Sequence, residues 1–143
     1  MVRPLHLEPN DKLEFRGDFN GPMDRELRIR NRTGKRQCYK LKSSDNSLFK
    51  IRPWTGFVKH GALTKATVTF VPREKGKKPS PTVLHHISLY EFPAKIKDTA
   101  DKSPQEIWST PDAKARPRKK KLRVEFRLDG EQAPPVRGRL RRR

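Results

Sequence analysis

The stretch KLRVEFRL at residues 121–128 alternates polar and apolar residues without a break. Successive side chains of a β-strand point to opposite faces of a sheet, so Leu122, Val124, Phe126 and Leu128 fall on one face. Such strict alternation predicts a strand that is buried on one side only. The apolar side needs a second layer to pack against, which favours two packed sheets.

Short segments of the same kind recur upstream, each bounded by Gly, Pro, Asn or Asp, and none keeps helical spacing for more than about two turns. We therefore predict an all-β domain, a sandwich of about seven strands, for which a chain of 143 residues has room. The strand-like segments are 5–7, 13–15, 27–30, 38–42, 49–53, 66–71, 83–92 and 121–128. The first two and the segment that ends at Pro53 are expected at sheet edges or strand ends.

A hairpin is predicted where Asn31 and Gly34 separate the segments 27–30 and 38–42, because Asn and Gly suit a tight turn. Alternation places the apolar residues of both segments on its inward face, namely Leu27, Ile29, Tyr39 and Leu41.

One short helix is predicted at residues 103–108, where Ser103 can cap the first turn, Pro104 begins it and Glu106 completes a capping box. Residues 54–58 are interpreted as a turn away from the preceding strand. Residues 73–81 are interpreted as a mobile Lys-, Gly- and Pro-rich loop. Cys38, Trp54 and Trp108 are expected in core positions.

The formal net charge is +19, and the positive charge is concentrated near the end of the chain. Residues 113–143 carry thirteen Lys and Arg against three acids, a surplus of ten, whereas residues 1–112 carry twenty-two against thirteen, a surplus of nine. We predict a sandwich domain at residues 1–128 and a disordered basic tail at residues 129–143. A field of this sign attracts nucleic acid, anionic lipid and acidic peptides without selecting among them.

The sequence predicts neither an enzyme nor a cofactor. His6, His60, His85 and His86 include one adjacent pair, whose side chains would point to opposite faces of a strand, so no metal site is expected. No phosphate-binding loop or nucleophile motif is found. The lone Cys38 and the absence of a signal peptide or a long apolar run favour a cytoplasmic protein, with nuclear residence left open.

A set of landmarks along the chain resembles the major sperm protein (MSP) domain family, and most of all its members in the VAMP-associated proteins of the endoplasmic reticulum. They are LEP at 7–9, LEFRG at 13–17, LRIRN at 27–31, CYKLKSS at 38–44, IRPWTG at 51–56, IW at 107–108 and KLRVEF at 121–126. The resemblance spans residues 5–128 and implies a seven-stranded immunoglobulin-like sandwich that binds proteins and has no catalytic role.

The resemblance also implies a peptide-binding face for acidic segments that carry two phenylalanines, called FFAT-like segments. Its matching positions here are Lys40, Lys42, Ser43, Ser44, His86, Ser88 and Lys121. The serines at 43 and 44 replace threonines that are usual in the family. His86 and Ser88 stand where a lysine and a methionine are usual, and we expect this difference to weaken the family's peptide contacts.

Two alternative functions are also compatible with the sequence. Nematode members of the family form dimers and filaments, so the chain, interpreted as a free-standing domain, could be a cytoskeletal protein. The tail residues Arg137, Arg139, Arg141, Arg142 and Arg143 could instead bind RNA or anionic lipid without sequence preference. The domain could also reach the cytoskeleton or the surface of the endoplasmic reticulum through a partner.

Overall fold

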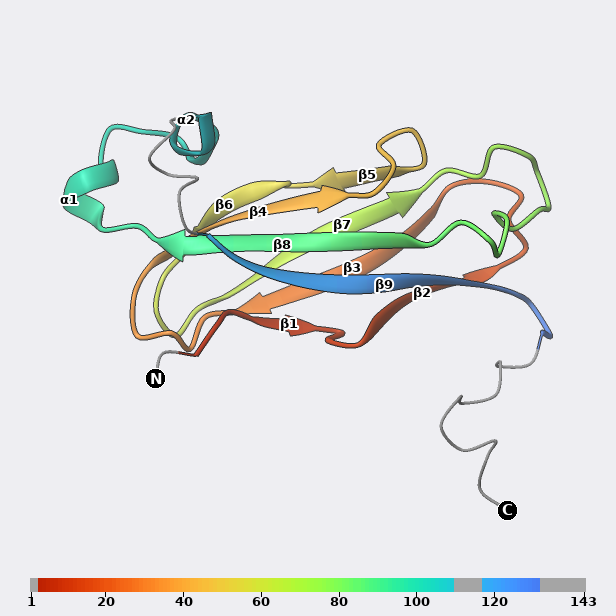
Figure 1. Cartoon of the computed structure of the whole chain (residues 1–143), viewed down its shortest axis with the longest axis horizontal. Coiled ribbons are helices and arrows are strands. Elements are labelled where there is room, and N and C mark those ends of the chain that lie inside the picture. The colour runs from red at the N-terminus through yellow and green to blue at the C-terminus, as the bar shows by residue number, and fades with distance from the viewer. Residues whose placement is uncertain (1–2, 110–116, 132–143) are drawn as a thin grey trace, which may run out of the picture.

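The computed structural model describes residues 3–109 and 117–131, which form two sheets packed face to face and two short helices (Figure 1). One sheet, here called sheet A, is antiparallel and has the order β1 (His6–Glu8), β3 (Met23–Arg30), β7 (Leu63–Phe70) and β5 (Phe49–Arg52). The other, sheet B, has the order β2 (Lys12–Gly17), β9 (Arg118–Leu128), β8 (His85–Pro93), β4 (Gln37–Ser43) and β6 (Thr55–Val58). In sheet B, β2 and β9 are parallel and the other pairs are antiparallel.

The all-β sandwich is confirmed, but the expected strand number is wrong, because the described residues form nine strands rather than seven. The chain passes from sheet A to sheet B between β1 and β2, and again between β5 and β6. Pro9 and Pro53 lie at these passages, and a proline cannot donate a ladder hydrogen bond. The segments at 5–7 and 13–15 were already predicted as separate strands, whereas residues 55–58 form β6 where a turn was expected.

The predicted hairpin at residues 27–42 is also wrong. β3 pairs with β1 and β7 in sheet A, whereas β4 pairs with β8 and β6 in sheet B. Buried Asn31 organises the crossing between them: its side-chain amide donates to the carbonyls of Lys35 and Val58, each at 2.8 Å. The four residues assigned to an inward face, Leu27, Ile29, Tyr39 and Leu41, are all buried, but they pack from opposite sheets.

Aromatic rings fill the space between the sheets. Phe70 lies 4.7 Å from Phe126, 5.5 Å from Phe49 and 5.6 Å from Phe15, measured between ring centroids. These rings come from both sheets, so the cluster joins the two layers. The strand predicted at 121–128 contributes Phe126 and begins earlier, at Arg118.

A second, smaller apolar cluster lies on the outer side of sheet B, beneath α2 (Pro104–Ser109). It contains Cys38 and Trp108, as expected for core residues, whereas Trp54 is 41% exposed and was wrongly assigned to the core. The capping box of α2 is confirmed by hydrogen bonds from Glu106 N–H to Ser103 Oγ and from Ser103 N–H to Glu106 Oε1. A further short helix, α1 (Ile96–Thr99), was not predicted.

The long connection at residues 71–84 contains neither helix nor strand, in agreement with the loop predicted at 73–81. It lies at the end of the sandwich opposite the helices (Figure 1). Residues 132–143, which include the five tail arginines, lie outside the described residues.

Candidate functional site

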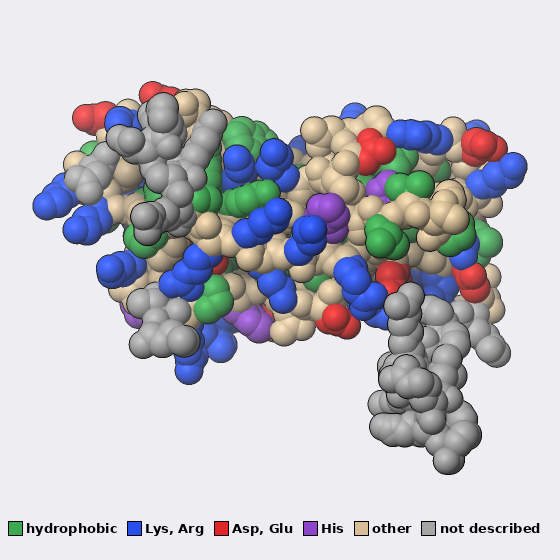
Figure 2. All heavy atoms as spheres, in the orientation of Figure 1, with side chains coloured by type: hydrophobic (Ala, Val, Ile, Leu, Met, Phe, Trp, Pro, Cys, Tyr) green, Lys and Arg blue, Asp and Glu red, His purple; other side chains and the backbone are tan. Residues whose placement is uncertain are grey.

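Alternate residues of neighbouring strands share the outer face of sheet B. The side chains on this face form three zones. Near α2 the face is apolar. At the far end, on β2 and β9, it is covered by ion pairs. Between these zones lies a group of lysines, here called the basic band and defined as Lys40, Lys42, Lys119 and Lys121. Figure 2 shows Lys and Arg side chains gathered over the middle of this face, where β8 and β9 run.

Strand register brings the basic band together from β4 and β9, on either side of β8. Lys42 is the partner of Ser88, and Ser88 is the partner of Lys121. One row further along, Lys40 is the partner of Tyr90, which is the partner of Lys119. Directly opposed residues lie about 5 Å apart, so each row places two lysines about 10 Å apart across one β8 residue.

Tyr90 supports the second of these rows with its ring. The Nζ atoms of Lys40 and Lys119 lie 5.3 and 5.5 Å from the ring centroid. Lys40 Nζ also lies 4.8 Å from the ring of Trp108, which α2 places beside the band. Aromatic faces attract ammonium groups, so these rings hold the two lysines over the sheet without neutralising them.

The zone on β2 and β9 differs because its charges are paired. Glu125 lies 3.1 Å from Lys12 and 3.2 Å from Arg123, and Arg127 lies 2.8 Å from Glu14. By contrast, Lys42, Lys119 and Lys121 form no ion pair with any residue that the structure describes. The positive charge of these three lysines is therefore uncompensated among the residues that the structure describes.

The structure brings five of the predicted site residues onto this outer face: Lys40, Lys42, His86, Ser88 and Lys121. Ser88 is only 3% exposed, because it lies between two long side chains.

The two predicted serines at the end of β4 lie differently. Ser43 pairs with Ile87, on the side of the sheet that faces the core, and its hydroxyl donates to Asn46 Oδ1 at 2.9 Å. Ser44 lies just beyond β4, where its Oγ accepts a hydrogen bond of 3.1 Å from the His86 N–H. Ser44 thus holds the backbone of His86 in place, and Ser43 does not share the face of the lysines.

His86 occupies the row next to Ser88, opposite Arg123 on β9. Burial lowers the pKa of His86 below its ordinary value of 6.5, and the positive charges of Lys121, Lys119 and His85 lower it further. The imidazole is consequently neutral at neutral pH, and it would gain a proton most readily when negative charge arrives beside it.

Sequence reasoning missed Tyr90, Lys119 and Trp54. The first two could have been found by alternation, since they lie two residues from Ser88 and Lys121 on the same strands. Trp54 gives no such signal. It lines a hollow of about 390 Å³ that also contacts Lys40, Lys42 and Ile51, where the chain crosses from β5 to β6. This hollow places an exposed indole beside the basic band.

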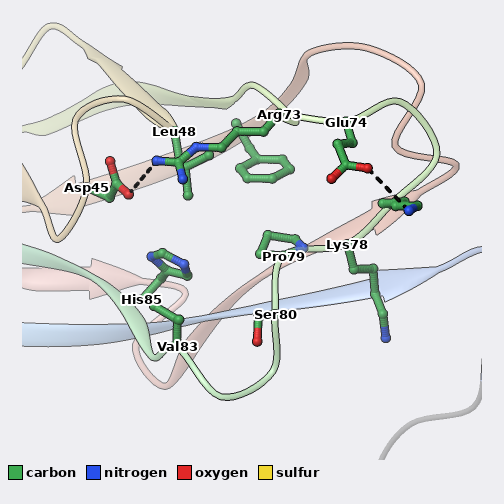
Figure 3. A pocket seen from close by; sticks show the side chains of 11 residues that line it. Asp45, Leu48, Arg73, Glu74, Lys78, Pro79, Ser80, Val83 and His85 are labelled. Atoms are coloured by element: carbon green, nitrogen blue, oxygen red, sulfur yellow. Dashed lines mark hydrogen bonds and ion pairs between the residues drawn. The ribbon is translucent and has the colours of Figure 1, made fainter.

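A different cavity, of about 270 Å³, lies at the end of the sandwich that carries the β7–β8 loop (Figure 3). Its charges are paired, with Arg73 at 3.2 Å from Asp45 and Lys77 at 3.2 Å from Glu74. Leu48 also lines this cavity, and Figure 3 shows His85 on the opposite side from Arg73. The paired charges leave little to attract a charged ligand.

Within the described residues, no group of three or more His, Cys, Asp or Glu is placed to hold a metal ion. In the same residues, no helix has the length and apolar character needed to cross a membrane.

The two sheets pack face to face, and the apolar side chains of the main core cluster lie between them. This arrangement defines an immunoglobulin-like β-sandwich domain. Solved structures of the same fold include WR4, an MSP family member of C. elegans, with a TM-score of 0.62, 16% identity and coverage of 84% of this chain and 94% of that one. The periplasmic chaperone SfaE matches with a TM-score of 0.60 and 11% identity, over 92% of this chain and 61% of its own.

The family model described as the MSP (major sperm protein) domain matches residues 4–113, and the chain belongs to this family. Vesicle-associated membrane protein-associated protein B of Rattus norvegicus is 29% identical over 139 residues, which cover 92% of this chain and 51% of the relative. Vesicle-associated membrane protein-associated protein B/C of Homo sapiens is 32% identical over 78 residues, 51% of this chain and 32% of the relative. The chain thus spans about half the length of the rat relative.

Proposed function

We propose that this domain is a non-enzymatic binding module that captures acidic peptide segments of partner proteins on its basic band. The observation that carries the proposal is the uncompensated positive charge of Lys42, Lys119 and Lys121 on one open sheet face. Acidic side chains of a peptide lying across β4, β8 and β9 would meet these lysines in the two rows that the register defines.

The hollow beside Trp54 supplies an apolar contact next to the charge. Its volume of about 390 Å³ is at the lower end of the range for small-molecule pockets and is enough for an aromatic side chain. Trp54 is 41% exposed, and Lys40 and Lys42 line the same hollow. An aromatic residue flanked by acids therefore fits best, and FFAT-like peptides, with two phenylalanines in an acidic tract, belong to this class.

Charge reversal tests the proposal. We expect the Lys42→Glu plus Lys121→Glu variant to bind an acidic two-phenylalanine peptide at least about tenfold more weakly in fluorescence anisotropy. Both side chains are exposed, so the fold should be retained, as circular dichroism can verify.

The matched control is Lys50→Glu plus Lys65→Glu, which reverses the same charge on exposed positions of sheet A. This control separates a local effect from the loss of net charge. Equal weakening by the two double variants would show that only the overall field matters. No binding of the peptide by the unmodified chain at micromolar concentration and low salt would refute the proposed function.

A further inference from the structure

β9 has an open edge beyond its pairing with β8. β8 begins at His85, the partner of Val124, whereas β9 continues to Leu128 and pairs there with β2 alone. Along a strand, the N–H and C=O groups of successive residues point to alternate edges. Asp129 N–H donates to Gly17 at the edge that faces β2, so the backbone groups of Phe126 and Leu128 point to the other edge.

Among the residues that the structure describes, a partner at that edge is found for only one of the two. Leu128 N–H donates to Glu131 Oε1 at 2.8 Å. For the N–H and C=O of Phe126, none of the described residues provides a hydrogen-bond partner across this edge. Unpaired backbone groups at a sheet edge are a template for another extended chain.

A cavity of about 390 Å³ adjoins this edge, between β9 and the β7–β8 loop. Figure 3 shows part of this loop. The lining of the cavity is rich in apolar side chains: Pro79, Pro81, Val83, Leu84, Val124 and Phe126. Val83 is 55% exposed and Leu84 is 85% exposed, so both side chains are accessible to a ligand at the rim of the cavity. The middle of the loop is held by the ion pair of Lys78 with Glu131 and by the Gly76 N–H, which donates to Phe19 O, and the Val83 N–H donates to Ser80 O within the loop. The cavity, here called the β9 groove, therefore exists before any ligand arrives.

The charge around the β9 groove favours an acidic segment. Lys121, which lines the groove and also belongs to the basic band, forms no ion pair with any described residue. Arg123 and Glu125 also line the groove, but they lie 3.2 Å apart and compensate each other. The groove thus lies next to the basic band along β9. Residues two positions apart on this strand, such as Lys121 and Arg123, are separated by about 7 Å.

We propose that the β9 groove takes an apolar side chain, such as leucine or phenylalanine, from the continuation of the same acidic peptide, whose backbone pairs with Phe126. This inference rests on the proposed function and adds a second anchor to it. Apolar contact with Val83 and Leu84 would provide affinity. The basic rim would select peptides in which the anchor residue is flanked by acids.

The test compares two synthetic peptides by isothermal titration calorimetry. Both contain the acidic two-phenylalanine segment and a short acidic extension. They differ at one position of the extension, which is leucine in one peptide and serine in the other. The comparison is repeated with this position placed at each residue of the extension in turn. At the best position we expect leucine to improve the affinity for the unmodified chain about tenfold. In the Val83→Ser plus Leu84→Ser variant this ratio should fall to about one, while the serine peptide binds as before.

Ile96→Ser is the matched control, since Ile96 is an apolar side chain of α1 that is 67% exposed, at the other end of the sandwich. It should leave the leucine advantage intact. The amide hydrogen of Phe126 should exchange more slowly when the leucine peptide is bound, and the serine peptide should protect it less.

The outcomes are distinguishable. If the acidic peptides bind but leucine gives no advantage at any position, the second anchor is refuted and the proposed function stands. If leucine helps equally in the Val83→Ser plus Leu84→Ser variant, the groove is the wrong location. If neither peptide binds, the proposed function fails, and the second anchor fails with it.

Discussion

Lys42 and Lys121 face each other across Ser88, each the direct strand partner of that one residue. They are far apart in the sequence and belong to strands that do not pair with each other. The two lysine side chains cover Ser88, which is only 3% exposed, so a carboxylate lying above the sheet at this row would meet both ammonium groups.

A carboxylate built into the domain at this point should compete with the peptide. In the Ser88→Glu variant, the new side chain lies between Lys42 and Lys121 and neutralises part of the basic band. We expect the affinity for an acidic peptide to fall about tenfold in fluorescence anisotropy, and Ser88→Ala to bind as the unmodified chain does. Unchanged binding by Ser88→Glu would show that the peptide does not use this row.

Binding of an acidic peptide should depend on pH through His86. Its pKa lies below the ordinary 6.5, so it is neutral at neutral pH and becomes charged as the pH falls. The charged and titratable groups around it are Lys42 on β4, His85 on β8, and Lys119, Lys121, Arg123 and Glu125 on β9, of which Arg123 and Glu125 form an ion pair.

A bound carboxylate favours protonated His86, so protonation and binding strengthen each other. We expect affinity to rise by up to about tenfold between about pH 7.5 and about pH 5.5. The His86→Gln variant should lose this gain and keep its affinity at the upper pH. A gain of the same size in His86→Gln would assign the effect to another group.

Cys38 should resist thiol reagents in the folded protein. It is fully buried beneath α2, and burial raises its pKa to about 12, so almost no thiolate exists at neutral pH. Labelling by a disulfide reagent should therefore require opening of α2. Loss of the cap in Ser103→Ala costs about 1 kcal/mol and should speed labelling about fivefold, with little change in the far-ultraviolet spectrum. A rate equal to that of the unmodified chain would mean that Cys38 is reached by another route.

Glu91 should make stability depend on pH. It is 3% exposed and accepts a hydrogen bond of 2.8 Å from the Leu5 N–H, and burial raises its pKa above the ordinary 4.5. A raised pKa in the folded state means that this group favours folding below 4.5 and loses that contribution as the pH rises through its folded pKa.

The Glu91→Gln variant retains an oxygen that can accept from Leu5 and carries no charge. Its free energy of unfolding, relative to the unmodified chain, should therefore increase from about pH 4 to about pH 7 in urea titrations. A difference that is constant over this interval would exclude ionisation of Glu91 as the cause.

Alternation was enough to predict most of the strands and the inward-facing residues. Leu27, Ile29, Tyr39 and Leu41 are buried as expected, since a period of two fixes which face of a strand a side chain joins. The capping box at Ser103 was equally predictable, because its hydrogen bonds join residues three positions apart. For the site, the same period of two predicts that Lys40 and Lys42 share one face of their strand, and both lie on the outer face of sheet B.

The pairing of strands could not be predicted in the same way. The β3–β4 hairpin was wrong because local turn residues do not tell whether the chain folds back within one sheet or crosses to the other. The exposure of Trp54 was missed for a related reason, since it depends on the crossing from β5 to β6 at Pro53.

The sequence by itself determined the period of each strand, the burial of alternate residues, the helix cap and the excess of positive charge, all of which depend on neighbouring residues. Only the tertiary structure decided that Lys42 and Lys121 flank Ser88, that Tyr90 lies between Lys40 and Lys119, and that Phe126 has an open edge. These relationships depend on which strands are adjacent and in what register. Adjacency and register come from the packing of the whole sandwich, because a one-residue shift would turn every side chain of a strand to the other face.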